Sequence, residues 1–310
     1  GFCRSAVPPT QQPFLSRLRE TSERRNRDLV RRVNTVLGPA ALDYDADVRP
    51  LTPAGNATER HICLAYARKA AARFPDGADL SAFWRNALGL EGEVPDLPEG
   101  PALLNRIRAR TMKRGGIGYV KPEEGAFPNL AETNRFILAC GALPVLTWLD
   151  GSSEGEGALD ELLEVMISHG AEAANIIPDR NFTPGQKDEK LEQLYRFADR
   201  ARLRGLPLIA GTEMNAPGNR FVDDFSAPEL SPLKDDFLRG SYWLFAHTVL
   251  EDRGGLGFGS DWARSTFPDR PARIAFYEEL GQKLPPDAAI RLPILDAKER
   301  PDSILDRADC

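Results

Sequence analysis

The chain of 310 residues, with 42% hydrophobic and 28% charged residues, has an ordinary globular composition and is long enough to bury a sizeable core. Its formal net charge of -6 argues against a general nucleic-acid-binding or anionic-membrane-binding surface. The four cysteines form no CxxC pair, so neither a zinc knuckle nor a disulfide framework is predicted. No apolar run is long enough to cross a membrane, and we expect a cytoplasmic protein.

The amino-terminal part of the chain is predicted to be mainly helical. Apolar residues at helical spacing run through residues 11–37, and a Gly-Pro stop signal follows them. A second helix is expected after a Pro/Gly/Asn loop, with Thr58 or Asn56 as its cap. We assign residues 1–74 to a helical amino-terminal part and residues 75–128, which begin with a stretch rich in Gly, Pro and acids, to a surface cap or insertion.

From residue 129 the sequence alternates between helix and strand. Three amphipathic helices each lead, past a glycine, to an apolar strand, and these strands are expected within residues 142–151, 171–181 and 206–215. Short connections of this kind predict parallel strands, in either an open doubly wound sheet or a closed barrel. We therefore predict an α/β chain of one domain, with β/α units over residues 129–263 and a tail over residues 264–310.

Polar side chains follow each of the three predicted strands. They are Asp150 after the first strand, Asp179, Arg180 and Asn181 after the second, and Glu213 and Asn215 after the third. Each also has a purely structural interpretation, as a turn residue, a helix cap or a solvated rim charge. Because the carboxyl ends of parallel strands are neighbours, and active sites of such folds lie there, we expect several of these side chains to line one polar pocket.

The third predicted strand resembles a known motif. LPLIAGTEMN is similar to the closing strand of the polymerase and histidinol phosphatase superfamily, which ends in Gly-Ser-Asp-X-His. In that comparison Gly211 and Thr212 take the Gly-Ser places, Glu213 takes the place of the metal-binding aspartate, and Asn215 that of the metal-binding histidine. ALPVLTWLDG resembles the strand that carries Ala-His-Pro in the family, with Trp148 where the histidine is expected. The resemblance implies a partial or distorted TIM-like (β/α) barrel with the activity of a metal-dependent phosphoester hydrolase.

The same resemblance implies a divalent metal, Mn, Mg or Zn, and a small phosphorylated substrate. The implied metal ligands are Asp150, Asp179, Glu213 and Asn215, and the first three of these are the implied catalytic residues. Asparagine is a neutral oxygen donor, so its presence at position 215 favours Mg or Mn. The opening His-X-His motif of the family is not found in the sequence, and we expect that the chain lacks the amino-terminal strands that carry it.

Cationic and polar residues are predicted to hold the phosphate of the substrate. Lys113 and Arg114 precede a glycine-rich turn where backbone amides and cations could meet an anion, although the P-loop spacing is absent. The alternative for this segment is a solvated basic helix end followed by a flexible turn. Arg60 lies in the first turn of the second predicted helix, a position that suits anions. The predicted substrate-binding residues are Arg60, Lys113, Arg114, Arg180 and Asn181.

Two other functions stay open at this point. GFGSDWA resembles the eighth strand of amidohydrolase-like barrels, which implies a C–N hydrolase with Asp261 as the catalytic base. The second alternative is a barrel remnant that binds a ligand without turnover. His247 lies within an apolar helical run, and we interpret it as a core residue rather than a metal ligand.

Overall fold

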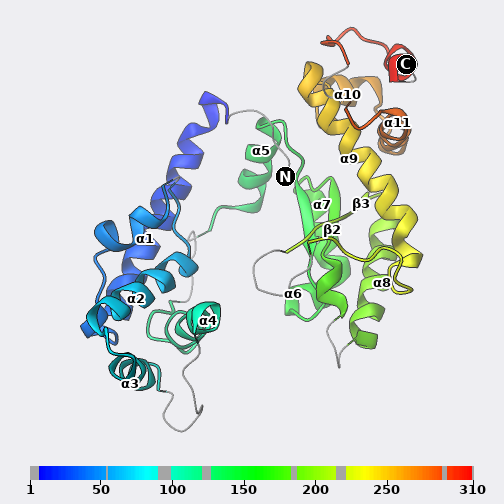
Figure 1. The fold of residues 1–310 in the computed structure, drawn as a ribbon. Coiled ribbons are helices and arrows are strands. Elements are labelled where there is room, and N and C mark those ends of the chain that lie inside the picture. Colours follow the sequence, from blue (N-terminus) through cyan, green and yellow to red (C-terminus); the bar gives the residue numbers. More distant parts are fainter. Residues whose placement is uncertain are drawn as a thin grey trace. The chain divides into compact units, whose positions relative to one another are not determined.

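The computed structural model describes residues 7–53, 55–89, 99–120, 127–182, 187–213, 221–287 and 292–308, and the chain divides into two compact units (Figure 1). We call residues 12–128 the helical unit, and residues 1–11 together with 129–310 the α/β unit. The sequence predicted one domain, and the border between the units falls where the β/α repeats were expected to begin. Within the described ranges, no helix is both long enough and apolar enough to cross a membrane.

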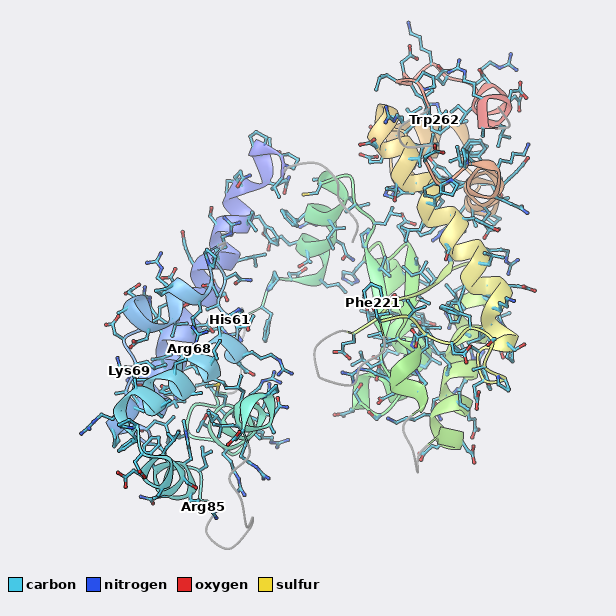
Figure 2. The ribbon with its side chains drawn as sticks, viewed as in Figure 1. His61, Arg68, Lys69, Arg85, Phe221 and Trp262 are labelled. Atoms are coloured by element: carbon cyan, nitrogen blue, oxygen red, sulfur yellow. The ribbon has the colours of Figure 1, made fainter. Side chains whose placement is uncertain are left out.

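Four α-helices lie within the described residues of the helical unit. These are α1 (Gln12–Asn34), α2 (Glu59–Arg73), α3 (Gly77–Ala87) and α4 (Gly100–Thr111). Thr58 is the amino-terminal cap of α2, as predicted, and its backbone N–H donates to Nδ1 of His61 at 3.1 Å, at the start of the helix (Figure 2). The predicted helices of the amino-terminal part are therefore confirmed.

One apolar core holds the helical unit together. Tyr66 of α2, Trp84 of α3 and Ile107 of α4 are all fully buried in it. The hydroxyl of Tyr66 donates to Oδ1 of Asn34 at 2.8 Å, which satisfies a polar group inside the core. Residues 75–128, expected to be a surface cap, thus contribute two core helices, because Trp84 and Ile107 bury large apolar surfaces in this cluster.

The α/β unit contains the predicted alternation of helices and parallel strands. Its described elements are α5 (Leu130–Ala139), β1 (Val145–Trp148), α6 (Glu154–Gly157), α7 (Leu159–Ser168), β2 (Ala173–Ile176), α8 (Lys187–Leu203), β3 (Leu208–Ala210), α9 (Lys234–Gly254), α10 (Asp261–Thr266), α11 (Arg270–Lys283) and α13 (Pro301–Ala308). The described strands form a parallel sheet in the order β1-β2-β3. The unit is thus mostly helical around a small parallel sheet, which confirms the α/β class.

Single turns connect several of these elements. They are the 3-10 turns Pro9–Gln11, Gly38–Ala40, Arg49–Leu51, Pro178–Phe182 and Ser231–Leu233, and a π turn at Tyr44–Val48. Of these, Pro178–Phe182 matters most here, because it carries Arg180 and Asn181 directly after β2.

The segment expected to be a tail belongs to the core. Phe276, Tyr277 and Leu280 of α11 are buried, and Ile304 of α13 is fully buried in the same cluster. The hydroxyl of Tyr277 donates to the carbonyl of Leu256, which anchors α11 to the turn that follows α9. Residues 264–308 are therefore a structural part of the α/β unit, because apolar residues at helical spacing give α11 a buried face.

Helix α9 lies against the sheet and makes its closest approach at Gly240. An ideal Cβ atom at this position would lie 1.9 Å from the carbonyl oxygen of Leu208 in β3. Such a distance is far below van der Waals contact, and the obstructing atom is backbone, which no side-chain rotamer can move away. Only glycine allows the observed packing of α9 on β3.

We expect the substitution Gly240→Ala to lower the free energy of unfolding by about 2 to 4 kcal/mol, because α9 must move away from β3. Gly157→Ala in α6 is the matched control, since an ideal Cβ there meets no atom within 4 Å. Urea unfolding followed by circular dichroism measures both. Equal stability of the two variants would contradict the close packing.

Candidate functional site

The carboxyl ends of the three strands are aligned by their pairing. Trp148 at the end of β1 pairs with Ile176 at the end of β2, and Ile176 pairs with Ala210 at the end of β3. The residues that follow these strands therefore emerge at one edge of the sheet. We call the side chains gathered there the polar edge, and it consists of Asp150, Glu156, Arg180, Asn181, Lys190 and Glu213.

Asp150 forms a largely buried ion pair with Lys190 of α8. The Lys190 Nζ lies 3.0 Å from the Asp150 Oδ2, and the two side chains are 14% and 11% exposed. Ser152 donates to the other carboxylate oxygen from its hydroxyl at 2.5 Å and from its backbone N–H at 3.1 Å, as expected of a turn residue. Burial raises the pKa of Asp150, but the hydrogen bonds from Ser152 and Lys190 outweigh it, so this pKa lies below its ordinary value. Asp150 is therefore ionised at neutral pH.

A second ion pair joins the ends of β2 and β3. The Nε of Arg180 donates to the Oε2 of Glu213, and the two side chains are 38% and 27% exposed. The hydrogen bond to Glu213 raises the pKa of Arg180, despite some burial, and the charges of Glu213, Asp150 and Glu156 act in the same direction. Solvent thus reaches this pair more easily than the pair between Asp150 and Lys190.

Two buried side chains hold the loops of the polar edge in place. Asn181 is fully buried, and its Nδ2 donates to the carbonyls of Leu149 at 3.2 Å and Ile177 at 3.0 Å. Its Oδ1 has no hydrogen-bond partner within the described ranges. Glu156 accepts a hydrogen bond from the backbone N–H of Leu149 at 2.7 Å, so it fixes the segment that carries Asp150. Both side chains therefore position the charged groups.

The structure brings Asp150, Arg180, Asn181 and Glu213 to the same edge of the sheet, and their role in one substrate pocket stays a prediction. The side chain of Asp179 and the whole of Asn215 lie outside the described residues. Two members of the polar edge were missed. The spacing of Ser153 and Glu156 is that of a capping box and could have pointed to Glu156. Lys190 has no local signal, because only the packing of α8 brings its ammonium group to Asp150.

Trp148 occupies the position where the resemblance places a histidine, and it does not face the polar edge. Its side chain is fully buried and stacks on Phe197 of α8, with the ring centroids 4.4 Å apart. This aromatic pair packs α8 onto β1. Trp148 is therefore part of the hydrophobic core.

The other predicted phosphate-binding residues belong to the helical unit. Arg60 donates from Nη1 to the Oδ1 of Asn105 at 3.1 Å, and the Lys113 Nζ lies 2.9 Å from the Oε2 of Glu59. Arg114 is exposed to solvent. The predicted role of these three residues in binding a substrate stays a prediction.

Asp150 and Glu213 of the polar edge each face a cation rather than another carboxylate. Within the described ranges, no group of three or more His, Cys, Asp or Glu side chains is placed to hold a metal ion. Lys190 and Arg180 occupy the positions beside Asp150 and Glu213 that a metal would take. Carboxylate oxygens are suitable donors for Mg or Mn, but with their charge already balanced the described donor set does not fit a divalent ion.

The alternative catalytic base, Asp261, lies at the other edge of the sheet. Asp261 is exposed and is the first residue of α10, and the hydroxyl of Ser260 caps this helix by accepting from the N–H of Ala263. The expectation of a strand in GFGSDWA is therefore wrong, since its Ser-Asp pair begins a helix. Arg264 of α10 pairs at 3.0 Å with Glu172, which precedes β2, so this helix lies at the amino-terminal edge.

Comparison with protein-family models, with curated proteins and with solved structures finds no match to this chain. The resemblance to the polymerase and histidinol phosphatase superfamily therefore stays a prediction. Any function has to be argued from the geometry of the polar edge.

We expect Lys190→Met to lower the free energy of unfolding by about 2 kcal/mol at neutral pH, because Asp150 then loses its cation while it stays largely buried. Since the pKa of Asp150 is depressed in the folded state, this difference should shrink as the pH falls through the carboxylate range. Urea unfolding at pH 7 and at about pH 3 tests both statements. As a control, Arg31→Met breaks an ion pair whose arginine is 74% exposed, and should cost less than about 0.5 kcal/mol.

His247 is a core residue, as predicted. It is 2% exposed, and its Nδ1 accepts a hydrogen bond from the N–H of Phe258 at 3.1 Å. Burial lowers the pKa of His247 to about 4, and a hydrogen bond with the backbone of Gly141 opposes this only in part. The imidazole is therefore neutral at physiological pH.

Between about pH 6.5 and pH 4 the unfolded chain binds a proton at His247 that the folded chain does not bind, so acidification through this window should destabilise the protein. The contribution reaches roughly 3 kcal/mol at the acid end. Chemical unfolding over this pH range should show a weaker pH dependence for His247→Gln than for the unaltered protein. Parallel curves for the two proteins would contradict the buried neutral imidazole.

Proposed function

We propose that the polar edge binds a small phosphorylated molecule and that the chain hydrolyses its phosphoester bond. The observation that carries this proposal is the solvent-accessible pair of Arg180 and Glu213 at the carboxyl edge of a parallel sheet, where folds of this class hold their substrates. In the proposal the three described strands are part of a TIM-like barrel. The buried pair of Asp150 and Lys190 beside it is the fixed part of the site.

In the first step, the phosphoryl group of the substrate competes with the carboxylate of Glu213 for Arg180. A phosphoryl group carries more charge than the carboxylate of Glu213 and fits the fork of a guanidinium group, so it displaces Glu213 from Arg180. Arg180 stays charged throughout, because its pKa is raised by its acidic neighbours. Binding of the substrate and release of Glu213 are therefore one event.

The released carboxylate is the proposed general base. Glu213 leaves an ion pair directly beside the bound phosphoryl group, where it can accept a proton from the attacking water as the new P–O bond forms. The P–O bond to the alcohol then breaks, and the alcohol leaves with the proton that Glu213 returns. Arg180 offsets the negative charge on the phosphoryl oxygens, and Lys190 adds positive charge from the neighbouring strand end, 3.4 Å from the carbonyl oxygen of Arg180. Asp150 keeps Lys190 in place and does not contact the substrate in this proposal.

The divalent metal implied by the resemblance stays a separate proposal. Coordination by Asp150, Asp179, Glu213 and Asn215 would require Lys190 and Arg180 to leave their carboxylates, and no step above uses a metal. Metal content of the purified protein, and its thermal stability with Mn, Mg, Zn or a chelator, test this. A bound stoichiometric metal that raises the melting temperature would support it.

The hydrolase proposal predicts a specific pattern among variants. With p-nitrophenyl phosphate or a sugar phosphate as substrate, we expect Glu213→Gln and Arg180→Met each to lower kcat/KM by about 100-fold or more. Asp261→Asn should leave the activity unchanged, because Asp261 lies at the opposite edge of the sheet. Circular dichroism confirms that each variant is folded.

Other outcomes favour the other functions. If the unaltered protein hydrolyses an amide or cyclic imide and only Asp261→Asn loses this activity, the result would favour the amidohydrolase function. Binding of a sugar phosphate that depends on Arg180, without any hydrolysis, would favour a protein that binds its ligand without turnover.

A further inference from the structure

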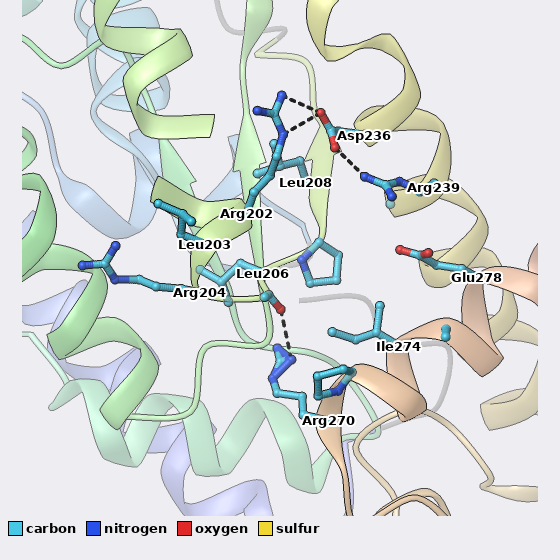
Figure 3. Close-up of a pocket in the computed structure, with 15 residues that line it drawn as sticks. Arg202, Leu203, Arg204, Leu206, Leu208, Asp236, Arg239, Arg270, Ile274 and Glu278 are labelled. Carbon is cyan, nitrogen blue, oxygen red and sulfur yellow. Dashed lines mark hydrogen bonds and ion pairs between the residues drawn. The ribbon is translucent and has the colours of Figure 1, made fainter. Parts of the chain in front are cut away.

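A pocket of about 670 Å³ lies at the amino-terminal edge of the sheet, away from the polar edge (Figure 3). It is bounded by the end of α8, the start of β3, and one face each of α9 and α11. Pro207 and Ile274 supply apolar surface, and Arg202, Arg204, Arg239 and Arg270 contribute guanidinium groups. Arg202 and Arg239 pair with Asp236 and Arg204 pairs with Asp160, so Arg270 is the arginine of the pocket whose charge is shared with the cluster beside it.

Beside this pocket, two arginines share one carboxylate, and a third arginine, Arg273, packs with one of them on the ring of Phe258. Arg264 and Arg270 lie 3.0 Å and 3.2 Å from the two carboxylate oxygens of Glu172. Arg273 is only 6% exposed, and its guanidinium group lies 4.7 Å from the ring centroid of Phe258, while that of Arg270 lies 5.7 Å from the same centroid. We call Arg264, Arg270 and Arg273 the arginine cluster.

The charges of the arginine cluster are not balanced. The Nε of Arg273 has no hydrogen-bond partner in the part of the chain that the structure describes. Burial lowers the pKa of Arg270 and of Arg273; Glu172 raises both and the charge of Arg264 lowers both, and the net shift is downward because burial is the largest effect. A buried cation without a partner is unfavourable, and a bound anion would supply the missing charge.

Arg270 connects the cluster to the pocket. It lines the pocket, where its Nη1 donates to the carbonyl of Gly205 at 3.3 Å, and it also reaches Glu172 within the cluster. Glu278 lines the opposite wall, half-buried, and no donor within the described ranges bonds to its carboxylate. The pocket therefore offers a cationic end and an acceptor end.

We propose that this pocket binds a small molecule whose phosphate or carboxylate group is held by the arginine cluster and whose hydroxyl or amino group faces Glu278. The apolar surface of Pro207 and Ile274 contacts the body of the ligand between these two ends. The proposal is independent of the hydrolase proposal, because the two sites lie at opposite edges of the sheet.

Thermal unfolding of the full chain tests the anion site. Inorganic phosphate at 10 mM should raise the melting temperature by about 2 °C or more relative to chloride at equal ionic strength, if the Kd is near 1 mM. Arg273→Met should remove the part of this shift that the arginine cluster contributes, so that only the contribution of Arg180 at the polar edge is left. It should leave the melting temperature without phosphate equal or higher, because an uncompensated buried charge is removed. Arg264→Met, at a more exposed position, gives the same test if the first variant does not fold.

Two further variants identify the site that is responsible. Arg180→Met should keep the part of the shift that depends on Arg273, whereas Arg300→Met, whose arginine is 81% exposed and lies outside the cluster, should keep the whole shift. No shift in the unaltered protein, an undiminished shift in Arg273→Met, or a shift lost only in Arg180→Met would each overturn the proposal.

A separate experiment tests whether the ligand is free phosphate or a larger phosphorylated molecule. A sugar phosphate should give a larger shift than inorganic phosphate at equal concentration, because its body fills the pocket. Ala275→Trp fills the pocket from an exposed position, so it should remove this extra shift and keep the response to inorganic phosphate. Equal shifts from both compounds in the unaltered protein would show a site for free phosphate alone and overturn the role of the pocket.

Discussion

Parallel pairing of β1, β2 and β3 is the constraint on which the rest of the α/β unit depends. Because the pairing aligns Trp148, Ile176 and Ala210, the three segments that follow the strands start from one line. A slip of one residue would turn every side chain of a strand to the other face and separate the groups at its end. The close packing of Gly240 in α9 on Leu208 joins this sheet to the long helix beside it.

The pairing of opposite charges then determines which side chains at the strand ends are fixed and which can exchange partners. Each described carboxylate of the polar edge has found a donor: Lys190 for Asp150, Arg180 for Glu213, and a backbone N–H for Glu156. The two ion pairs differ in burial, so one is a fixed structural element and the other is open to exchange. At the opposite edge the arginine cluster lacks this balance. The two edges of one small sheet thus differ in whether their charges are already paired.

Much of the fold could be predicted from the sequence, because helix and strand periodicities are local. The alternation after residue 129, the cap at Thr58 and the core position of His247 follow from such signals. It was harder to predict from the sequence which helices would be buried in the core. Trp84 and Ile107 were placed in a surface segment, and α11 in a tail, because a helix with a short apolar stripe does not reveal which neighbour will bury it. GFGSDWA was read as a strand although Ser260 is an ordinary helix cap.

At the candidate site, too, features that are local in the sequence were predicted, and features that depend on packing were not. The strand-end residues Asp150, Arg180 and Glu213 were found because their positions relative to apolar runs are visible in the sequence. Their partners were not, since Lys190 reaches Asp150 only through the packing of α8, which brings together residues forty positions apart. A metal was expected where the described structure has cations, because a list of acidic residues does not show which opposite charges the fold will place beside them.

The pair of Arg180 and Glu213 also implies a threshold for anions at the polar edge. Glu213 belongs to the same chain as Arg180, so it competes for this guanidinium group at a high effective concentration. A singly charged anion from solution therefore gains little by replacing it. A doubly charged anion with several oxygen atoms gains an additional charge-assisted hydrogen bond in the exchange. In the proposed function, we therefore expect this pair to bind phosphate-like dianions in preference to common monoanions such as chloride and acetate.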